Sequence, residues 1–254
     1  MAGRLSDKRI IISGAVGGIG LATADAFVAE GARVVIFDID DERGAEAVER
    51  LDGAAPGRSR FIACDVSHEA AVQAALAKAA DWLGGLDALV QHAGIQRAGL
   101  VETFSVADWD ALMEINARSV FLGAKHALQY LREAEGGCIV NTASTAGIRG
   151  GTGMTAYSAS KGAIMAFSKA LAVEYAEYGI RVNSVCPGVI DTPFNEPNIA
   201  VLGGRDVQDR LVEATVPLRR RGLPHEVAPI FVYLVSDESS YVTAQHFVVD
   251  GGMV

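Results

Sequence analysis

The chain has 254 residues, of which half are hydrophobic and 21% are charged, and it contains 28 glycines. This composition is typical of a well-packed globular protein with many tight turns, and it excludes extensive disorder. The formal net charge of −9 at pH 7 excludes a nucleic-acid-binding surface, since the only basic run, Arg219–Arg221, is too short to form one. The same acidity makes an acidic carrier protein a poor partner.

The three cysteines, Cys64, Cys138 and Cys186, lie far apart in the sequence, each within an apolar run. Their spacing fits neither a disulfide framework nor a metal site, so we expect reduced, buried thiols and no metal ion. Residues 1–9 contain no apolar signal-peptide core, and no run of about 18 uncharged apolar residues could span a membrane. We therefore expect a cytoplasmic protein without a membrane partner.

Seven short β-rich runs alternate with longer helical patterns from one end of the chain to the other. Runs such as Val34–Phe37 are apolar without alternation, which is typical of parallel strands that helices cover on both faces. The sequence therefore predicts an α/β fold with a Rossmann-like, doubly wound, seven-stranded parallel sheet. The predicted strands are Arg9–Ser13, Arg33–Asp38, Arg60–Asp65, Ala88–His92, Cys138–Thr142, Arg181–Cys186 and His246–Val249.

Helical patterns fill the segments between these strands. Gly31, Gly84 and Gly179 lie just beyond three helix ends as stop signals, and Ser67 and Ser105 are predicted N-caps. No repeat, low-complexity tract or linker divides the chain, so we expect a single domain over residues 1–254. The predicted helices include Gly18–Glu30, His68–Leu83, Val106–Glu133 and Thr155–Tyr178.

One long stretch, Val189–Leu223, shows no regular pattern. It carries Pro193, Pro197, Gly203 and Gly204 among apolar residues, which favours a mobile substrate flap over a core element. An ordinary surface insertion is the alternative interpretation.

The first predicted strand runs into the turn Ser13–Gly20, which is rich in glycine, and a helix begins within that turn. Glycines allow the backbone amides and the helix N-terminus to approach a pyrophosphate, so we expect Gly14, Gly18, Ile19 and Gly20 to bind a dinucleotide. The spacing Gly-x-x-x-Gly-x-Gly differs from the Gly-x-Gly-x-x-Gly fingerprint, and a plain glycine-rich turn is the alternative.

Asp38 ends the second predicted strand about 20 residues after the glycines, where a carboxylate can accept hydrogen bonds from both adenosine ribose hydroxyls. It would repel a 2′-phosphate, and neither the glycine turn nor Ile39 offers a cation to receive one, so we predict NAD as the cofactor rather than NADP. Asp65, followed by Val66, is placed to bind the adenine amino group. A carboxylate that stabilises the start of the next helix is an almost equally good interpretation of Asp65.

Tyr157 and Lys161 lie four residues apart in a predicted helix, so they share one face. A phenol titrates near pH 10, and a neighbouring cation favours phenolate, which can take a proton from an alcohol. The spacing therefore indicates an acid/base pair in which Lys161 lowers the Tyr157 pKa. Taken alone, such a pair also arises by chance on helix surfaces.

Together with Pro187–Gly188, these motifs resemble the short-chain dehydrogenase/reductase family over essentially the whole chain. The resemblance implies a catalytic tetrad of Asn116, Ser144, Tyr157 and Lys161. Tyr157 would exchange the hydroxyl proton, Ser144 would bind the substrate oxygen, and Lys161 would also grip the nicotinamide ribose. Asn116 would hold a water that relays protons. The implied activity is hydride transfer between a nicotinamide and the carbon of a secondary alcohol or ketone.

The resemblance also places cofactor contacts after two other strands. After the sixth strand it implies that Pro187, Gly188, Val189, Ile190 and Thr192 lie along the nicotinamide and the pyrophosphate. After the fourth strand it implies that Ala93 and Gly94 let the adenosine ribose approach the backbone. The family pattern there is Asn-Asn-Ala-Gly, whereas this chain reads Gln91-His92-Ala93-Gly94, so any bonds from the second Asn fall to His92, which we interpret as structural.

By the same resemblance, the substrate pocket is mostly apolar, and Arg149 binds an acid group or is a solvated loop charge. A small hydrophobic or cyclic secondary alcohol fits this pocket best, a polyol or sugar second, and a carrier-bound 3-oxoacyl group third. An idle NAD-binding sensor is the alternative of a different class. The family also implies a homotetramer. The expected pocket walls are Ile95, Gln96, Thr145, Ile148, Arg149, Met154 and residues 189–202.

Overall fold

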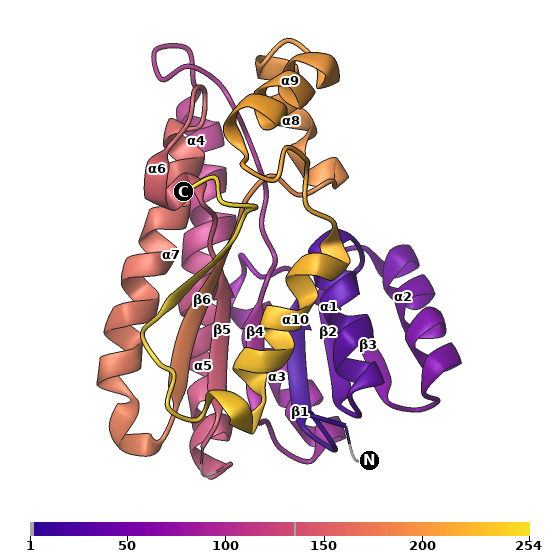
Figure 1. Cartoon of the computed structure of the whole chain (residues 1–254). Helices are drawn as coiled ribbons and strands as arrows, with labels where there is room; N and C mark the ends of the chain where they lie inside the picture. The colour runs from indigo at the N-terminus through magenta and orange to yellow at the C-terminus, as the bar shows by residue number, and fades with distance from the viewer. Residues whose placement is uncertain (1–2, 135) are drawn as a thin grey trace.

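The structure, a computed structural model, describes residues 3–134 and 136–254. Its centre is one seven-stranded sheet in the order β3-β2-β1-β4-β5-β6-β7, in which every neighbouring pair is parallel (Figure 1). The predicted fold is therefore confirmed. The strands are β1 (Arg9–Ser13), β2 (Arg33–Asp38), β3 (Ser59–Ala63), β4 (Ala88–Gln91), β5 (Cys138–Thr142), β6 (Arg181–Pro187) and β7 (His246–Val249).

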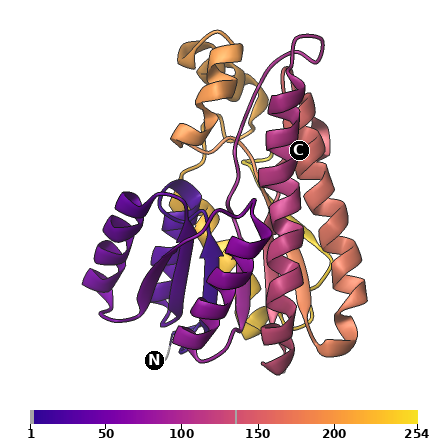
Figure 2. The same ribbon diagram turned by 180° about the vertical axis from the view of Figure 1, so that it is seen from behind.

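The central strands are buried on both faces because helices cover both. Alternate side chains of β1 point in opposite directions, so Ile10 and Ile12 join one hydrophobic core while Ile11 joins the other. The first core contains side chains of α1 (Gly18–Ala29), α2 (Asp41–Ala54) and α10 (Pro224–Val235). The second core contains side chains of α3 (Glu69–Leu83), α5 (Ser119–Glu133) and α7 (Thr155–Glu174), on the face seen in Figure 2.

Several predicted boundaries were wrong by a few residues. Strand β3 ends at Ala63, so Asp65 lies beyond it, and β6 continues to Pro187. The predicted helix Thr155–Tyr178 ends as an α-helix at Glu174, and a 3₁₀ turn completes it. These shifts are of the size expected at frayed element ends.

The two predicted N-caps had different outcomes. Ser105 is confirmed, because its Oγ accepts a hydrogen bond from the Asp108 amide at 3.0 Å at the start of α4 (Val106–Leu112). The prediction for Ser67 was wrong, because His68 occupies the N-cap position of α3 and the Ser67 hydroxyl donates to Asp65 Oδ1 at 2.7 Å instead.

The predicted helix Val106–Glu133 is divided in the structure. Helix α4 passes into a π-helical turn, Met113–Arg118, before α5 begins at Ser119. A π-helical turn adds a residue to the local repeat and often occurs at functional sites. Here it contains Asn116, whose side chain is fully buried.

The stretch after β6 is not irregular as predicted. It folds into a 3₁₀ turn, then α8 (Glu196–Val201) and α9 (Arg205–Thr215), which stand beyond the end of the sheet in Figure 1. Its two ends meet, since Ile190 and Gly222 form a parallel bridge and the Gly222 amide donates to the Val189 carbonyl at 3.0 Å. We call residues 190–222 the α8–α9 segment.

Ion pairs also join α9 to the two ends of this segment, where Ile190 and Gly222 form their bridge. The Arg221 side chain is only 10% exposed and lies 2.7 Å from Asp209 of α9 and 3.4 Å from Asp191. We expect Arg221→Met to loosen the segment, because it leaves Asp209 without its cation and Asp191 with Arg205 of α9 alone, at a cost of about 1–3 kcal/mol. Limited chymotrypsin digestion should then cut residues 190–222 several-fold faster. Exposed Arg210 of α9 is the matched control, and equal digestion of Arg210→Met and Arg221→Met would contradict the expectation.

Candidate active site

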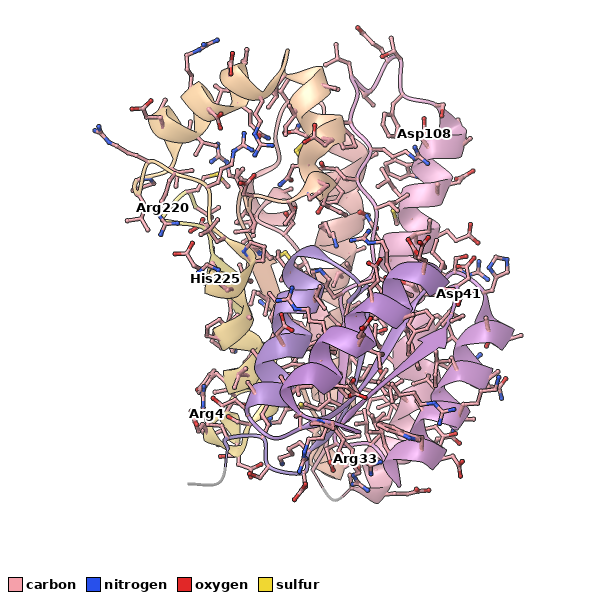
Figure 3. The ribbon with its side chains drawn as sticks, turned by 90° about the vertical axis from the view of Figure 1, so that its right-hand side faces the viewer. Arg4, Arg33, Asp41, Asp108, Arg220 and His225 are labelled. Carbon is pink, nitrogen blue, oxygen red and sulfur yellow. The ribbon has the colours of Figure 1, made fainter. Side chains whose placement is uncertain are left out.

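A cavity of about 1170 Å³ opens where the strands end. Its lining residues lie at or just after the ends of β1, β2, β4, β5 and β6. The α8–α9 segment covers the cavity from outside the sheet. In Figure 3 the labels Arg33, at the start of β2, and Asp41, at the start of α2 just after β2, mark the two ends of that strand. The strand order reverses between β1 and β4, and ligands of open α/β sheets bind at such a switch point.

The glycine turn after β1 lies tightly against its neighbours. Gly14 has φ +71°, and a Cβ there would lie 2.6 Å from the Ala93 Cα in the loop after β4. A Cβ at Gly20 would lie 2.3 Å from the Gly14 carbonyl oxygen, so only glycine lets α1 pack this closely on the turn. Helix α1 begins at Gly18, and both Gly18 and Ile19 line the cavity. The turn therefore fits a pyrophosphate at a helix N-terminus.

Asp38 lies at the end of β2 on the cavity wall. Its Oδ1 accepts hydrogen bonds from the amides of Ile39 at 2.8 Å and Asp40 at 3.3 Å. Burial raises the pKa of this carboxyl above its usual value, while the two amides oppose the shift. The amides orient the carboxylate toward the cavity, where it fits the hydroxyls of a ribose.

Arg43 was missed by the sequence reasoning. It extends from the first turn of α2 to the glycine turn, where it donates to the Val16 carbonyl at 3.1 Å, and it lines the cavity. Its charge acts to lower the Asp38 pKa. The glycine turn and Ile39 offer no cation, as the sequence reasoning held, but Arg43 brings one to this end of the site from α2. A signal was present, because Asp40 caps α2 through the Arg43 amide and so places Arg43 at the third helical position, near the strand end.

Asp65 and Val66 line the cavity as predicted, but the Asp65 carboxylate is partly engaged. It accepts hydrogen bonds from the Ser67 amide at 2.9 Å and hydroxyl at 2.7 Å, and it lies 3.0 Å from His68 Nδ1. Partial burial acts to raise the Asp65 pKa, but these partners lower it overall. The geometry thus agrees with the alternative interpretation, a carboxylate that shapes the turn before α3.

His92 has the structural role expected of it. Its Nδ1 lies 3.0 Å from Thr142 Oγ1, and burial, with the charge of Lys161, lowers its pKa to about 4. The ring is therefore neutral at pH 7. The amides of His92 and Ala93 both donate to Ser13 Oγ at 3.2 Å, so the loop after β4 is tied to β1.

The four residues of the predicted tetrad come from three places in the fold. Ser144 follows β5, and its Oγ accepts from the Ala146 amide at 3.1 Å. Tyr157 and Lys161 lie one turn apart in α7, and all three residues line the cavity. Asn116 is fully buried, where its carboxamide exchanges hydrogen bonds with the Ile95 backbone at 2.8 and 3.0 Å. Asn116 thereby holds the loop after β4 against α7, because it also donates to Ser160.

Tyr157 is only 5% exposed, and this burial raises its pKa above the ordinary value, partly offset by a hydrogen bond with Ser144. Burial outweighs the opposing effects on the phenol, and the expectation that Lys161 lowers the Tyr157 pKa stays a prediction. Lys161 Nζ donates to the Thr142 carbonyl at 2.9 Å and lies 5.7 Å from the Tyr157 ring centre. The charge is near the phenol, but desolvation decides the Tyr157 pKa.

Burial lowers the Lys161 pKa from 10.5 to about 8. The folded state therefore holds fewer protons than the unfolded state between these values, and stability should rise with pH across that window. The shift corresponds to about 3 kcal/mol in the free energy of unfolding. Buried Lys161 destabilises the folded state by this amount below pH 8, and the destabilisation disappears as the pH approaches 10.5. We expect Lys161→Met to be more stable than the wild type at pH 7, with a gain that shrinks by pH 10. Urea unfolding at both pH values measures this gain, and a gain that is independent of pH would contradict it.

The other end of the cavity lies under the α8–α9 segment. Of the predicted walls, Ile95, Gln96, Thr145, Arg149 and Met154 line it, and Phe194 lies 6.2 Å from Tyr157 between ring centres. The prediction that Ile148 lines the pocket was wrong, because this residue is 42% exposed and lies outside the lining. The sequence reasoning missed the lining residues Gln208, Leu211, Thr215 and Met253.

Arg149 is exposed and donates to the Met253 carbonyl at 3.2 Å, in agreement with an ordinary loop charge.

Among residues 3–134 and 136–254, no group of three or more His, Cys, Asp or Glu side chains could hold a metal ion. No helix within the same ranges is both long enough and apolar enough to cross a membrane. The three cysteines are free and buried.

Comparison with known proteins identifies the family. A family model described as Enoyl-(Acyl carrier protein) reductase matches residues 14–254. The cyclopentanol dehydrogenase of Comamonas sp. (strain NCIMB 9872) is 41% identical, over 98% of each chain. The 3-alpha-(or 20-beta)-hydroxysteroid dehydrogenase of Mycobacterium tuberculosis (strain ATCC 25618 / H37Rv) is 38% identical, over 100% of this chain and 92% of the relative. The crystal structure of levodione reductase matches with a TM-score of 0.93 and 34% identity, over 97% of each chain. This chain belongs to the short-chain dehydrogenase/reductase family of NAD(P)-dependent oxidoreductases.

Proposed function

We propose that this chain is an NAD-dependent dehydrogenase that interconverts a secondary alcohol and a ketone on a small hydrophobic or cyclic substrate. One observation carries the proposal. Ser144, Tyr157 and Lys161 line the same cavity as the glycine turn and Asp38, so a dinucleotide and a substrate can meet beside the phenol.

The chemistry of the site follows from its hydrogen bonds. In oxidation, Tyr157 reacts as phenolate, the form that the positive charges of Lys161 and of bound oxidised NAD would favour, and its Oη takes the proton of the substrate hydroxyl; in reduction the phenol returns that proton to the carbonyl oxygen. The Ser144 hydroxyl donates a hydrogen bond to the same oxygen, while its own oxygen accepts one from the Ala146 amide. Bound NAD supplies the carbon centre that accepts or releases hydride. Lys161 supplies an N–H donor for a ribose hydroxyl, while the water relay through Asn116 stays a prediction.

The choice of NAD rests on Asp38. A half-buried carboxylate at the ribose end favours two free hydroxyls and repels a 2′-phosphate. Pro187, Gly188, Val189, Ile190 and Thr192 line the same cavity, which supports contacts along the rest of the cofactor. Ala93 and Gly94 line it as well, after β4.

The substrate class rests on the cavity walls and on the relatives. Ile95, Met154, Phe194 and Leu202 give the substrate end an apolar lining. The named substrates of the cyclopentanol and hydroxysteroid dehydrogenases are a secondary alcohol and a hydroxysteroid, which supports a cyclic alcohol here. Polyols, sugars and 3-oxoacyl groups are the alternatives within the family, and an idle NAD-binding sensor is the alternative outside catalysis.

Assembly and location are further parts of the proposal. Val106, Phe121 and Val173, on α4, α5 and α7, are 75%, 47% and 76% exposed. Apolar side chains exposed on these helices support the homotetramer that the family implies. The cytoplasmic location stays a prediction.

The test is turnover of purified protein with NAD or NADP and a panel of cyclic, aryl and polyol secondary alcohols, followed at 340 nm beside Tyr157→Phe. Turnover of a cyclic alcohol with NAD that disappears in the variant would support the proposal. NAD binding without turnover of any alcohol or ketone would favour the sensor.

A further inference from the structure

An unpartnered carboxamide lies in the cavity, on the inner face of α9. Gln208 is only 4% exposed, and its Oε1 finds no hydrogen-bond donor among residues 3–134 and 136–254. A buried amide without a partner costs about 1–3 kcal/mol, and most buried amides in proteins are therefore paired. Gln208 lines the cavity, so the missing partner belongs to whatever occupies that cavity.

The position of Gln208 in α9 makes it part of the substrate end. Gln208, Leu211 and Thr215 recur at helical spacing and all line the cavity, while Val212, one turn after Gln208, is buried. Of these lining residues, Leu211 is apolar and the Thr215 hydroxyl donates to the Leu211 carbonyl, whereas the Gln208 amide oxygen has no partner among the described residues. The α8–α9 segment also brings Phe194 to within 6.2 Å of the Tyr157 ring centre, so α9 belongs to the same covering segment as a residue beside the reacting group.

The chemistry of the amide limits the ligand group. A neutral carboxamide accepts a hydrogen bond from a hydroxyl through its oxygen and donates to a ketone through its nitrogen, but it has no charge to offset a carboxylate or phosphate. Arg149, a cation on the same lining, is exposed and contacts the Met253 carbonyl. The buried amide of Gln208, like Gln96 Oε1 on the same lining, which also lacks a partner in the part of the chain that the structure describes, is thus suited to a neutral oxygen.

We propose that Gln208 is a specificity-determining residue that binds a second oxygen function of the substrate, which is a neutral cyclic diol, hydroxyketone or dione rather than a simple cyclic alcohol. The inference rests on the proposed function and adds a second polar anchor, distinct from Ser144 and Tyr157. A site built to bond such an oxygen discriminates strongly against the analogue that lacks it, because the amide is then left buried and unpaired.

The test compares cyclohexanol with 1,2-, 1,3- and 1,4-cyclohexanediol as substrates with NAD. We expect the wild type to prefer at least one diol in kcat/KM, and Gln208→Met to lower the ratio of diol to cyclohexanol by about 10- to 100-fold. The same exchange at Gln129, exposed on α5, is the matched control and should keep the wild-type ratio. Turnover with an unchanged ratio in Gln208→Met overturns the inference and leaves the dehydrogenase assignment intact.

A binding measurement separates the two proposals when turnover is absent. With NADH present, at least one of the three diols should raise the Tm of the wild type and should not raise that of Gln208→Met. If no alcohol is oxidised but this diol-dependent shift occurs only with Gln208, the amide binds as proposed and the dehydrogenase proposal fails. If no diol shifts the Tm of the wild type, the inference is overturned.

Discussion

We expect Tyr157→Phe to lower kcat for alcohol oxidation by about 10²- to 10⁴-fold, the contribution typical of a positioned acid/base group. The change removes only the phenol oxygen. The Phe ring keeps the packing against Phe194, and Tyr157 is 5% exposed, so water cannot easily reach the reacting oxygen to replace the lost proton acceptor. Stopped-flow and steady-state rates at 340 nm measure the loss.

NADH binding should change by no more than a few-fold in Tyr157→Phe, because the glycine turn and Asp38 are untouched. Fluorescence titration of NADH measures this binding. Tyr241, which is fully exposed, gives the matched control Tyr241→Phe, and its kcat should equal that of the wild type. If Tyr157→Phe retains more than a tenth of the wild-type kcat, another group exchanges the proton.

The second large effect concerns cofactor choice. In Asp38→Ser we expect the ratio of kcat/KM for NADP to that for NAD to rise by about 100-fold or more, which equals about 2.7 kcal/mol. The carboxylate that would repel a 2′-phosphate is removed, and the small hydroxyl leaves room for the phosphate. Arg43, already at the glycine turn, then supplies a guanidinium that suits a phosphate.

The role of Arg43 is tested by the double variant Asp38→Ser/Arg43→Met. In this double variant the ratio of kcat/KM for NADP to that for NAD should fall back toward the wild-type value, because loss of repulsion alone gives no attraction for the 2′-phosphate. Arg50, which lies on α2 like Arg43 and pairs with Asp25 of α1, is the matched control, and Asp38→Ser/Arg50→Met should behave like Asp38→Ser. Equal ratios in all three variants would show that Arg43 does not receive the phosphate.

The α8–α9 segment shows where pattern reasoning misled. Its prolines and glycines suggested an irregular flap, but Pro197 lies in the first turn of α8, where proline fits, and Gly203 and Gly204 connect two helices. The residues that cover the cavity from α9 therefore stayed hidden. They lie at helical spacing, and an assumption of irregular structure cannot reveal that spacing.

The strand segments, the glycine turn and the Tyr157–Lys161 pair were determined by the sequence itself, since each depends on residues close together in the chain. Apolar runs form buried strands, and four residues make one helical turn, whatever packs around them. Ser144 and Asn116 were located through the family resemblance and its conserved order of motifs.

Only the tertiary structure decided which side chains meet and how much water they lose. Arg43 reaches the glycine turn because α2 packs beside α1, and Gln208 is buried because α9 covers the cavity. Burial likewise raises the Tyr157 pKa and lowers that of Lys161 to about 8, opposite to what charge proximity predicted for Tyr157. Desolvation depends on every element packed around a group, so sequence spacing alone cannot give it.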